Sequence, residues 1–119
     1  MARTLLIVDD HAEFRAFARR LLDDDGFEVA GEAADGEAAL EAVERLRPDV
    51  VLLDVQLPRL DGFEVARRVA REGLGPCVVL TSSRDASDYG GRIAASPARG
   101  FIPKAELSGD ALEAFVSDD

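Results

Sequence analysis

The sequence lacks the features that several classes of protein require. Cys77 is its only cysteine, so the chain can form no internal disulfide and no cysteine-rich metal site. No apolar stretch approaches the roughly 18–20 residues that a membrane-spanning helix needs. The start, Met1-Ala2-Arg3, leads within a few residues into an acidic pair instead of the apolar region of a signal peptide. We therefore expect a soluble, cytoplasmic chain with no membrane partner.

Positive charge is also scarce, because 14 Lys and Arg residues stand against 24 Asp and Glu residues and the formal net charge is −10. Binding to nucleic acid depends on clustered basic side chains that neutralise phosphates. We therefore expect no direct nucleic-acid binding by this chain. Long repeats, low-complexity tracts and linkers are absent too, and 119 residues suffice for one ordinary core. Residues 1–119 are expected to form a single domain.

The sequence does contain short apolar runs that alternate with segments of helical periodicity, which is the pattern of βαβ units. Three runs are almost continuously hydrophobic, as strands buried on both faces of a parallel sheet are. These runs are Leu5–Val8, Val50–Leu53 and Cys77–Leu80. Weaker runs at Phe27–Ala30 and Gly100–Ile102 fit edge strands. The expected fold class is therefore α/β, with five parallel strands and helices on both faces.

Apolar residues recur at helical spacing between these runs. Four segments show the pattern clearly: Phe14–Leu22, Ala39–Leu46, Phe63–Ala70 and Ala111–Val116. Asp61 is placed to cap the third, and the acidic run Asp23–Asp25 is expected to be a solvated helix end. The segment Ala86–Ala95 has a sparse apolar stripe, and Gly90 and Gly91 each cost roughly 1 kcal/mol relative to Ala in a helix. We expect this helix to be short or mobile.

Polar residues stand where the expected strands end. Asp9 and Asp10 follow the first strand, Asp54 the third and Thr81 the fourth, and Lys104 comes shortly after the fifth. In an open parallel sheet, ligands gather outside the carboxyl ends of the strands. We expect these acids, the hydroxyl and the amine to converge on that one edge.

Three converging carboxylates repel one another unless positive charge lies between them. A hard divalent cation supplies it, and Mg²⁺ prefers carboxylate and water oxygens together with substrate phosphate. One carboxylate can then attack phosphorus to give an acyl phosphate. A lysine supplies fixed charge to the phosphoryl oxygens, and a hydroxyl can donate a hydrogen bond to one of them.

Four stretches of the sequence together carry a family resemblance that covers essentially the whole chain. They are Leu6-Ile7-Val8-Asp9-Asp10-His11, Leu53-Asp54-Val55-Gln56-Leu57-Pro58 with Asp61-Gly62, Leu80-Thr81-Ser82, and Gly100-Phe101-Ile102-Pro103-Lys104. The sequence resembles the receiver domain of response regulators in bacterial two-component systems. It is similar to receivers often followed by a helix-turn-helix output domain, and we identify no such domain in this chain.

The resemblance implies a flavodoxin-like fold with strand order 2-1-3-4-5. It implies that Asp54 accepts the phosphoryl group, and that Asp9, Asp10, Asp54 and the backbone carbonyl of Gln56 hold Mg²⁺, or Mn²⁺ in its place. Thr81 and Lys104 would contact the phosphoryl group.

Further implications concern the switch and its partners. Phe101 would move between exposed and buried positions as Thr81 moves. A sensor histidine kinase or a phosphotransfer protein would be the donor, a homodimer could form on phosphorylation, and the chain would be a switch with slow self-dephosphorylation, not an enzyme.

Two details qualify the resemblance. Receivers commonly carry Pro directly after the site lysine, whereas here Pro103 precedes Lys104 and Ala105 follows it. We expect this loop still to present the lysine to the acids. His11, the only histidine, is interpreted as an early residue of the first helix and left out of the site.

Other functions stay open at this point. An electron carrier of flavodoxin type is disfavoured, because Asp9 and Asp10 would repel a cofactor phosphate. A small phosphatase with an Asp nucleophile would usually carry an Asp-x-Asp pattern on the first strand. An interaction module that keeps the receiver fold without using phosphate is compatible with the same residues.

Overall fold

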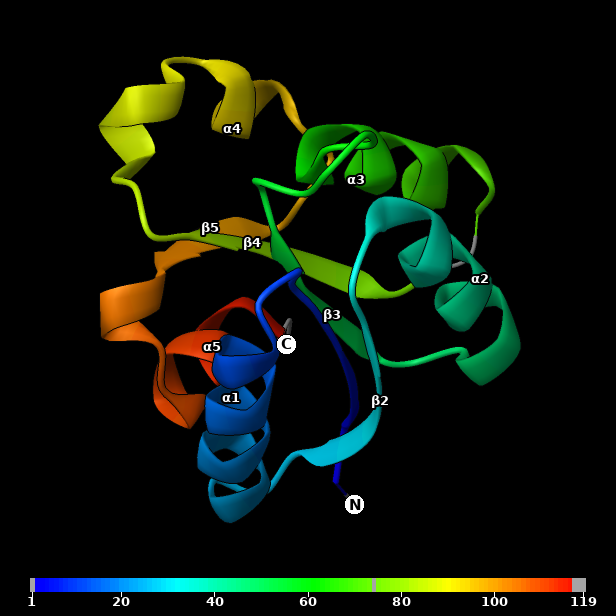
Figure 1. Ribbon diagram of the computed structural model, residues 1–119, viewed down its shortest axis with the longest axis vertical. Helices are drawn as coiled ribbons and strands as arrows, with labels where there is room; N and C mark the ends of the chain where they lie inside the picture. Colours follow the sequence, from blue (N-terminus) through cyan, green and yellow to red (C-terminus); the bar gives the residue numbers. More distant parts are fainter. Residues whose placement is uncertain (1, 74, 117–119) are drawn as a thin grey trace.

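The structure, a computed structural model, describes residues 2–73 and 75–116. It contains one parallel sheet with the strand order β2-β1-β3-β4-β5 (Figure 1). The strands are β1 (Thr4–Val8), β2 (Glu28–Ala33), β3 (Val50–Asp54), β4 (Cys77–Ser82) and β5 (Gly100–Pro103). This order confirms the expected flavodoxin-like α/β fold, with the two weaker strands at the edges.

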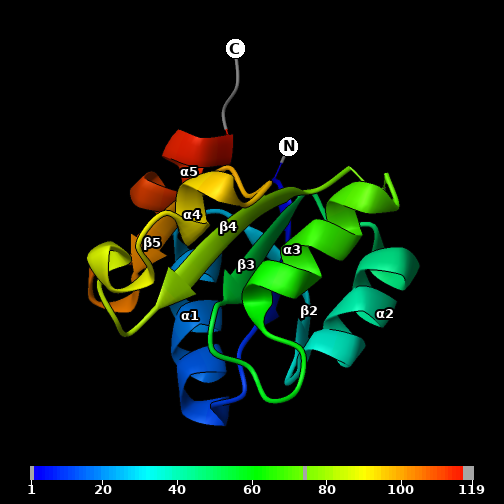
Figure 2. The ribbon, with the colours of Figure 1, turned by 90° about the horizontal axis from the view of Figure 1, so that it is seen from above.

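Helices cover both faces of the sheet. They are α1 (Ala12–Asp24), α2 (Gly36–Leu46), α3 (Gly62–Arg71), α4 (Arg92–Ala95) and α5 (Gly109–Val116), with short 3₁₀ helices η1 (Ala86–Tyr89) and η2 (Lys104–Glu106). Figures 1 and 2 show α1 and α5 on one face, and α2, α3 and α4 on the other. None of the helices in the described ranges is long and apolar enough to cross a membrane.

The buried strands contribute side chains to two separate cores, one on each face of the sheet, because successive side chains of a strand point to opposite faces. Leu5 and Ile7 of β1 pack with α1 and α5, whereas Leu6 and Val8 pack with α2 and α3. All four are at most 1% exposed. Full burial of such a side chain stabilises the fold by roughly 1.5–3 kcal/mol. Continuous apolar runs in the sequence therefore mark strands covered on both sides.

Side-chain caps fix where the helices begin. The carboxylate of Asp61 accepts a hydrogen bond from the backbone N–H of Glu64 at 3.0 Å, as expected for the N-cap of α3. Asp25 departs from its interpretation as a purely solvated acid. Its carboxylate accepts a hydrogen bond from the backbone N–H of Gly109 at 2.7 Å. The end of α1 is thereby tied to the first turn of α5, where negative charge is favourable.

The segment after β4 is short, as the sequence indicates. It forms η1 and α4, each four residues long and without a buried residue. Few apolar contacts and exposed backbone hydrogen bonds are the features of regions that open locally at low free energy. We predict that hydrogen exchange measured by NMR or mass spectrometry will find residues 86–95 exchanging faster than β4 and α3. Uniformly strong protection across this segment would contradict the expected mobility.

Gly62 allows α3 to start directly against the end of β3. A Cβ atom at this position would lie 2.4 Å from the backbone oxygen of Asp54 and 2.8 Å from the Cα atom of Val55. Backbone atoms cannot yield as a flexible side chain can, so the added methyl group forces α3 away from the strand.

We predict that Gly62→Ala lowers the free energy of unfolding by about 1–3 kcal/mol. Gly91→Ala is the matched control, because a Cβ atom there would meet nothing within 4 Å. Urea denaturation followed by circular dichroism measures both. Equal denaturation midpoints for the two variants would show that the close approach of α3 to β3 at Gly62 does not affect stability.

Candidate functional site

The carboxyl edge of the sheet brings the expected site residues together. Asp9 directly follows β1, Asp54 is the last residue of β3, and Thr81 lies next to Asp54 in the register of β3 and β4. Lys104 is the first residue of η2, directly after β5. Because β1, β3 and β4 are neighbours in a parallel sheet, their carboxyl ends deliver these side chains to one place.

Lys104 lies between two buried carboxylates. Its Nζ atom is 2.6 Å from Oδ2 of Asp9 and 3.6 Å from Oδ2 of Asp54. The same ammonium group lies 4.4 Å from the ring centre of Phe14 on α1, which adds a cation–π contact. The unusual order Pro103-Lys104-Ala105 therefore still brings the lysine to the acids.

Asp54 is almost fully buried, with 2% of its surface exposed. Its pKa is raised from the ordinary value of 3.8 to about 6, chiefly by burial and also by the neighbouring charge of Asp9, although Lys104 and the backbone N–H of Gln56 lower the pKa. That N–H donates to Oδ1 of Asp54 at 3.1 Å. The one ammonium group beside Asp54 therefore does not offset the burial of its carboxylate and the negative charge of Asp9.

The donor set fits a divalent cation. Asp9, Asp10, His11 and Asp54 each offer one ligand atom, and these atoms all lie within 4.8 Å of one another. Oδ2 of Asp9 is buried and has no hydrogen-bond partner among the described residues, although the Lys104 ammonium lies close enough to form an ion pair with it. One lysine does not balance three carboxylates, and a cation among them would supply the missing charge. The expected role of the Gln56 carbonyl stays a prediction.

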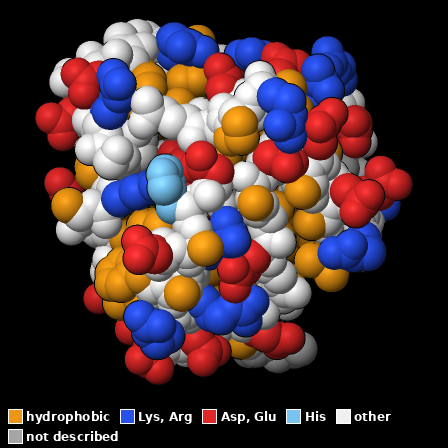
Figure 3. Space-filling model, in the orientation of Figure 1, with side chains coloured by type: hydrophobic (Ala, Val, Ile, Leu, Met, Phe, Trp, Pro, Cys, Tyr) orange, Lys and Arg blue, Asp and Glu red, His pale blue; other side chains and the backbone are white. Residues whose placement is uncertain are grey.

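His11, which the sequence analysis set aside, lies in this cluster. It is the N-cap residue of α1, and its Nδ1 atom is 3.1 Å from Oδ1 of Asp9 and 3.0 Å from Oδ1 of Asp10. Figure 3 shows the pale blue histidine on the surface beside acidic and basic side chains. Its position directly after the acid pair was the only signal in the sequence, and that position does not fix where the ring points.

Thr81 and Phe101 connect the site to β5 and the segment after β4. The Thr81 hydroxyl is buried and donates to the backbone oxygen of Ile102 at 2.6 Å. The Phe101 ring packs edge-on against Tyr89 with ring centres 6.1 Å apart. The Tyr89 hydroxyl is hydrogen-bonded to the Ser82 hydroxyl at 2.6 Å. The sequence analysis assigned Tyr89 and Ser82 no part in the site.

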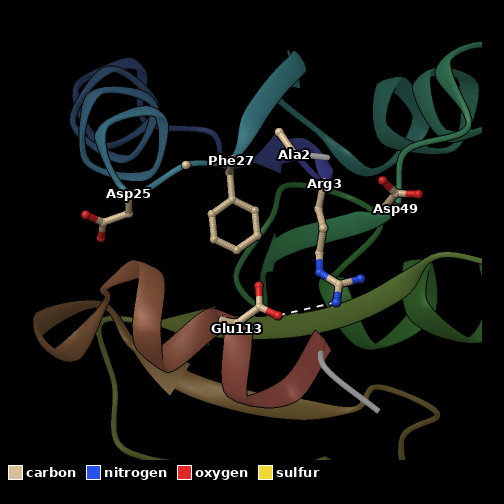
Figure 4. A pocket seen from close by; sticks show the side chains of 7 residues that line it. Ala2, Arg3, Asp25, Phe27, Asp49 and Glu113 are labelled. Atoms are coloured by element: carbon tan, nitrogen blue, oxygen red, sulfur yellow. Dashed lines mark ion pairs between the residues drawn. The ribbon is translucent and has the colours of Figure 1, made fainter. Parts of the chain in front are cut away.

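A separate pocket lies at the opposite end of the strands. It is lined by Ala2, Arg3, Asp25, Gly26, Phe27, Asp49 and Glu113, from segments that precede β1, β2 and β3 and from α5 (Figure 4). Arg3 and Glu113 form an ion pair of 3.3 Å across it. None of the expected site residues lines this pocket, so it is distinct from the acidic cluster.

The raised pKa of Asp54 predicts that ionisation of this residue lowers the free energy of unfolding of the metal-free chain. The folded chain holds the Asp54 proton more tightly than the unfolded chain does, so stability falls as pH rises from about 4 through 6. We expect Asp54→Asn to raise the free energy of unfolding by about 1–3 kcal/mol above pH 7, with little effect below about pH 4.

Urea titrations in the presence of a chelator, at both pH values, measure this difference. Asp24→Asn is the control, because Asp24 is an exposed acid at the end of α1 and lacks the burial of Asp54. A stability gain for Asp54→Asn that is the same at both pH values would contradict the assignment of the penalty to a buried charge.

Comparisons with known proteins agree with this geometry. The sequence profile of the response regulator receiver domain matches residues 5–116. The transcriptional regulatory protein PdtaR of Mycobacterium tuberculosis is 42% identical over 85 residues, which cover 70% of this chain and 42% of that protein. The transcriptional regulatory protein DegU of Brevibacillus brevis is 35% identical over 109 residues, covering 91% of this chain and 46% of that protein.

The chain thus spans less than half of the length of these two relatives. Among solved structures, a signal receiver domain from Mycobacterium tuberculosis that carries the name NarL superimposes with a TM-score of 0.87. It is 33% identical, and the match covers 98% of each chain. The chain belongs to the response regulator receiver domain family of two-component systems.

Proposed function

We propose that this chain is a phosphoacceptor switch that takes a phosphoryl group onto Asp54 in a reaction that depends on a divalent cation. The observation that carries the proposal is the position of Lys104, whose ammonium faces both Asp9 and Asp54 beside a cluster of ligand atoms. A buried carboxylate with a fixed cation on one side and further acids on the other suits phosphoryl transfer, which depends on positioning and charge stabilisation.

The proposed donor is the phosphohistidine of a sensor histidine kinase or of a phosphotransfer protein. An oxygen of the ionised Asp54 carboxylate attacks phosphorus, the P–N bond breaks, and the imidazole leaves with a proton from solvent. Lys104 supplies positive charge to the transferred oxygens, and its contact with Asp9 holds it in place. Asp9, Asp10, Asp54 and the Gln56 carbonyl would hold Mg²⁺ or Mn²⁺, which supplies the remaining charge neutralisation.

Thr81 would carry the signal away from Asp54. Its hydroxyl now bonds to Ile102 of β5, and a phosphoryl group on Asp54 would offer it a more strongly charged acceptor. Movement of Thr81 would release β5 and allow Phe101 to change its packing against Tyr89. The surface of α4, β5 and α5 would then shift between two arrangements that already exchange.

The remaining expectations belong to this proposal. The chain acts as a switch with slow self-dephosphorylation and not as an enzyme, and it works in the cytoplasm without binding nucleic acid itself. A homodimer formed on phosphorylation would use the surface that shifts. Because PdtaR and DegU are named transcriptional regulatory proteins, we propose that the switch controls transcription through an attached or separate output.

Acetyl phosphate with Mg²⁺ tests the chemistry directly. We predict that intact-protein mass spectrometry will show a gain of one phosphoryl group, which disappears in Asp54→Asn and after addition of EDTA. Lys104→Ala should slow the gain by roughly 10²–10³, the usual cost of removing one group that stabilises transition-state charge. The control Asp24→Asn, an exposed acid on α1, should be modified as fast as the unaltered chain.

The same experiment separates the alternatives. An interaction module that no longer uses phosphate would bind its partner without any mass gain. A small phosphatase would turn over a phosphoester without a stable adduct. A mass gain that persists in Asp54→Asn would place the acceptor elsewhere and overturn the assignment.

A further inference from the structure

We propose that His11 is a ligand of the cation at this site through Nδ1, and that it shifts the preference of the site from Mg²⁺ toward Mn²⁺, Co²⁺ and Ni²⁺. The inference rests on the proposed function, because it requires that the acidic cluster holds a divalent cation. It goes further by assigning a nitrogen ligand to a site otherwise built from oxygen atoms.

The spacing of the ligand atoms supports this assignment. Nδ1 of His11 lies 3.0 Å from Oδ1 of Asp10 and 3.1 Å from Oδ1 of Asp9. Adjacent ligands of an octahedral ion with bonds of about 2.1 Å are separated by about 3 Å. The imidazole nitrogen therefore already lies at the separation of an adjacent ligand from each of the two carboxylate oxygens, and all of these ligand atoms lie within 4.8 Å of one another.

The surrounding contacts hold His11 beside the acids and leave its ring accessible. The backbone N–H of His11 donates to Oδ1 of Asp9 at 2.8 Å, which holds the residue against the acid. The other oxygen of Asp9 faces Lys104, so the two oxygens have separate tasks. The His11 side chain is 70% exposed, and its ring can therefore accept an ion from solvent without rearrangement of the core.

A purely positioning role for His11 predicts different chemistry. In that case, Nδ1–H only donates a hydrogen bond to Asp9 or Asp10, and any side chain with a donor at the same place would serve. A ligand role makes a prediction about metal choice, because imidazole suits transition metals whereas Mg²⁺ prefers oxygen. Metal selectivity therefore separates the two roles without reference to phosphoryl transfer.

The chain offers a clean spectroscopic test because His11 is its only histidine. Untagged protein is loaded with Mn²⁺ and studied by pulsed electron paramagnetic resonance. We expect the coupling of a directly bound imidazole ¹⁴N nucleus, and its loss in His11→Asn. The asparagine amide retains a donor for Asp9 and lacks the imidazole nitrogen, so it is the matched variant for the positioning role.

Calorimetric titration gives the second readout. A lost ligand costs at least as much as a lost outer partner of a ligand, so His11→Asn should weaken Ni²⁺ and Co²⁺ binding by roughly tenfold or more. Mg²⁺ binding should change far less. Asp10→Asn should weaken binding of all of these ions, because it removes an oxygen ligand from the same cluster.

The outcomes separate the two proposals. The role of His11 would be overturned if Mn²⁺ bound to the unaltered chain showed no ¹⁴N coupling and if Ni²⁺ bound His11→Asn as tightly as the unaltered chain. If Asp10→Asn still lost Mn²⁺ in that case, the cation site itself would stand. Mn²⁺ binding that survives in both variants, or no cation binding by the unaltered chain, would overturn both the His11 proposal and the cation dependence of the proposed function.

Discussion

The burial of two like charges beside one lysine is the constraint on which the site depends. Asp9 and Asp54 are at most 2% exposed, and both face the Lys104 ammonium at the end of the sheet. Buried carboxylates that repel each other destabilise the fold unless compensating charge is present. The raised pKa of Asp54 reflects this destabilisation, and the burial of two apolar cores offsets it. The same excess of negative charge favours a cation among the acids, and that cation would in turn reduce the repulsion of an incoming phosphoryl group in the proposed reaction.

Parallel strand order turns this constraint into a defined geometry. β1 and β3 are neighbours, with Val8 paired to Leu53, so the residues that follow them emerge side by side. β4 lies on the other side of β3 and pairs Thr81 with Asp54. Gly62 lets α3 begin against the Asp54 carbonyl, which fixes the loop that carries Gln56. The acids therefore meet because the backbone places them, and flexible side chains contribute little to the placement.

The sequence predicts the features that periodicity and strand ends determine, and misses those set by side-chain orientation. The strands, the edge on which Asp54 and Lys104 lie, and the weak segment after β4 all follow from apolar patterning and glycine content. The orientation of His11 does not, because an N-cap residue can point toward either acid or into solvent. The hydrogen bond between Tyr89 and Ser82 joins residues seven positions apart, across a bend and the short helix η1, and no periodic pattern in the sequence predicts such a contact.

The hydrogen bond between Thr81 and β5 determines how easily a change at Asp54 would alter the packing of β5 in the proposed switch. One neutral hydrogen bond, from Thr81 to Ile102, holds the threonine in its present place, and such a bond contributes only about 1 kcal/mol net. A hydrogen bond to a charged phosphoryl oxygen is worth more, at roughly 1.5–3 kcal/mol. The segment Ala86–Ala95, which would adjust next in the proposed switch, has no buried residue in η1 or α4 that would oppose its movement. In the proposed switch, a small difference in hydrogen-bond strength at Asp54 would therefore suffice to shift the packing of Phe101 against Tyr89.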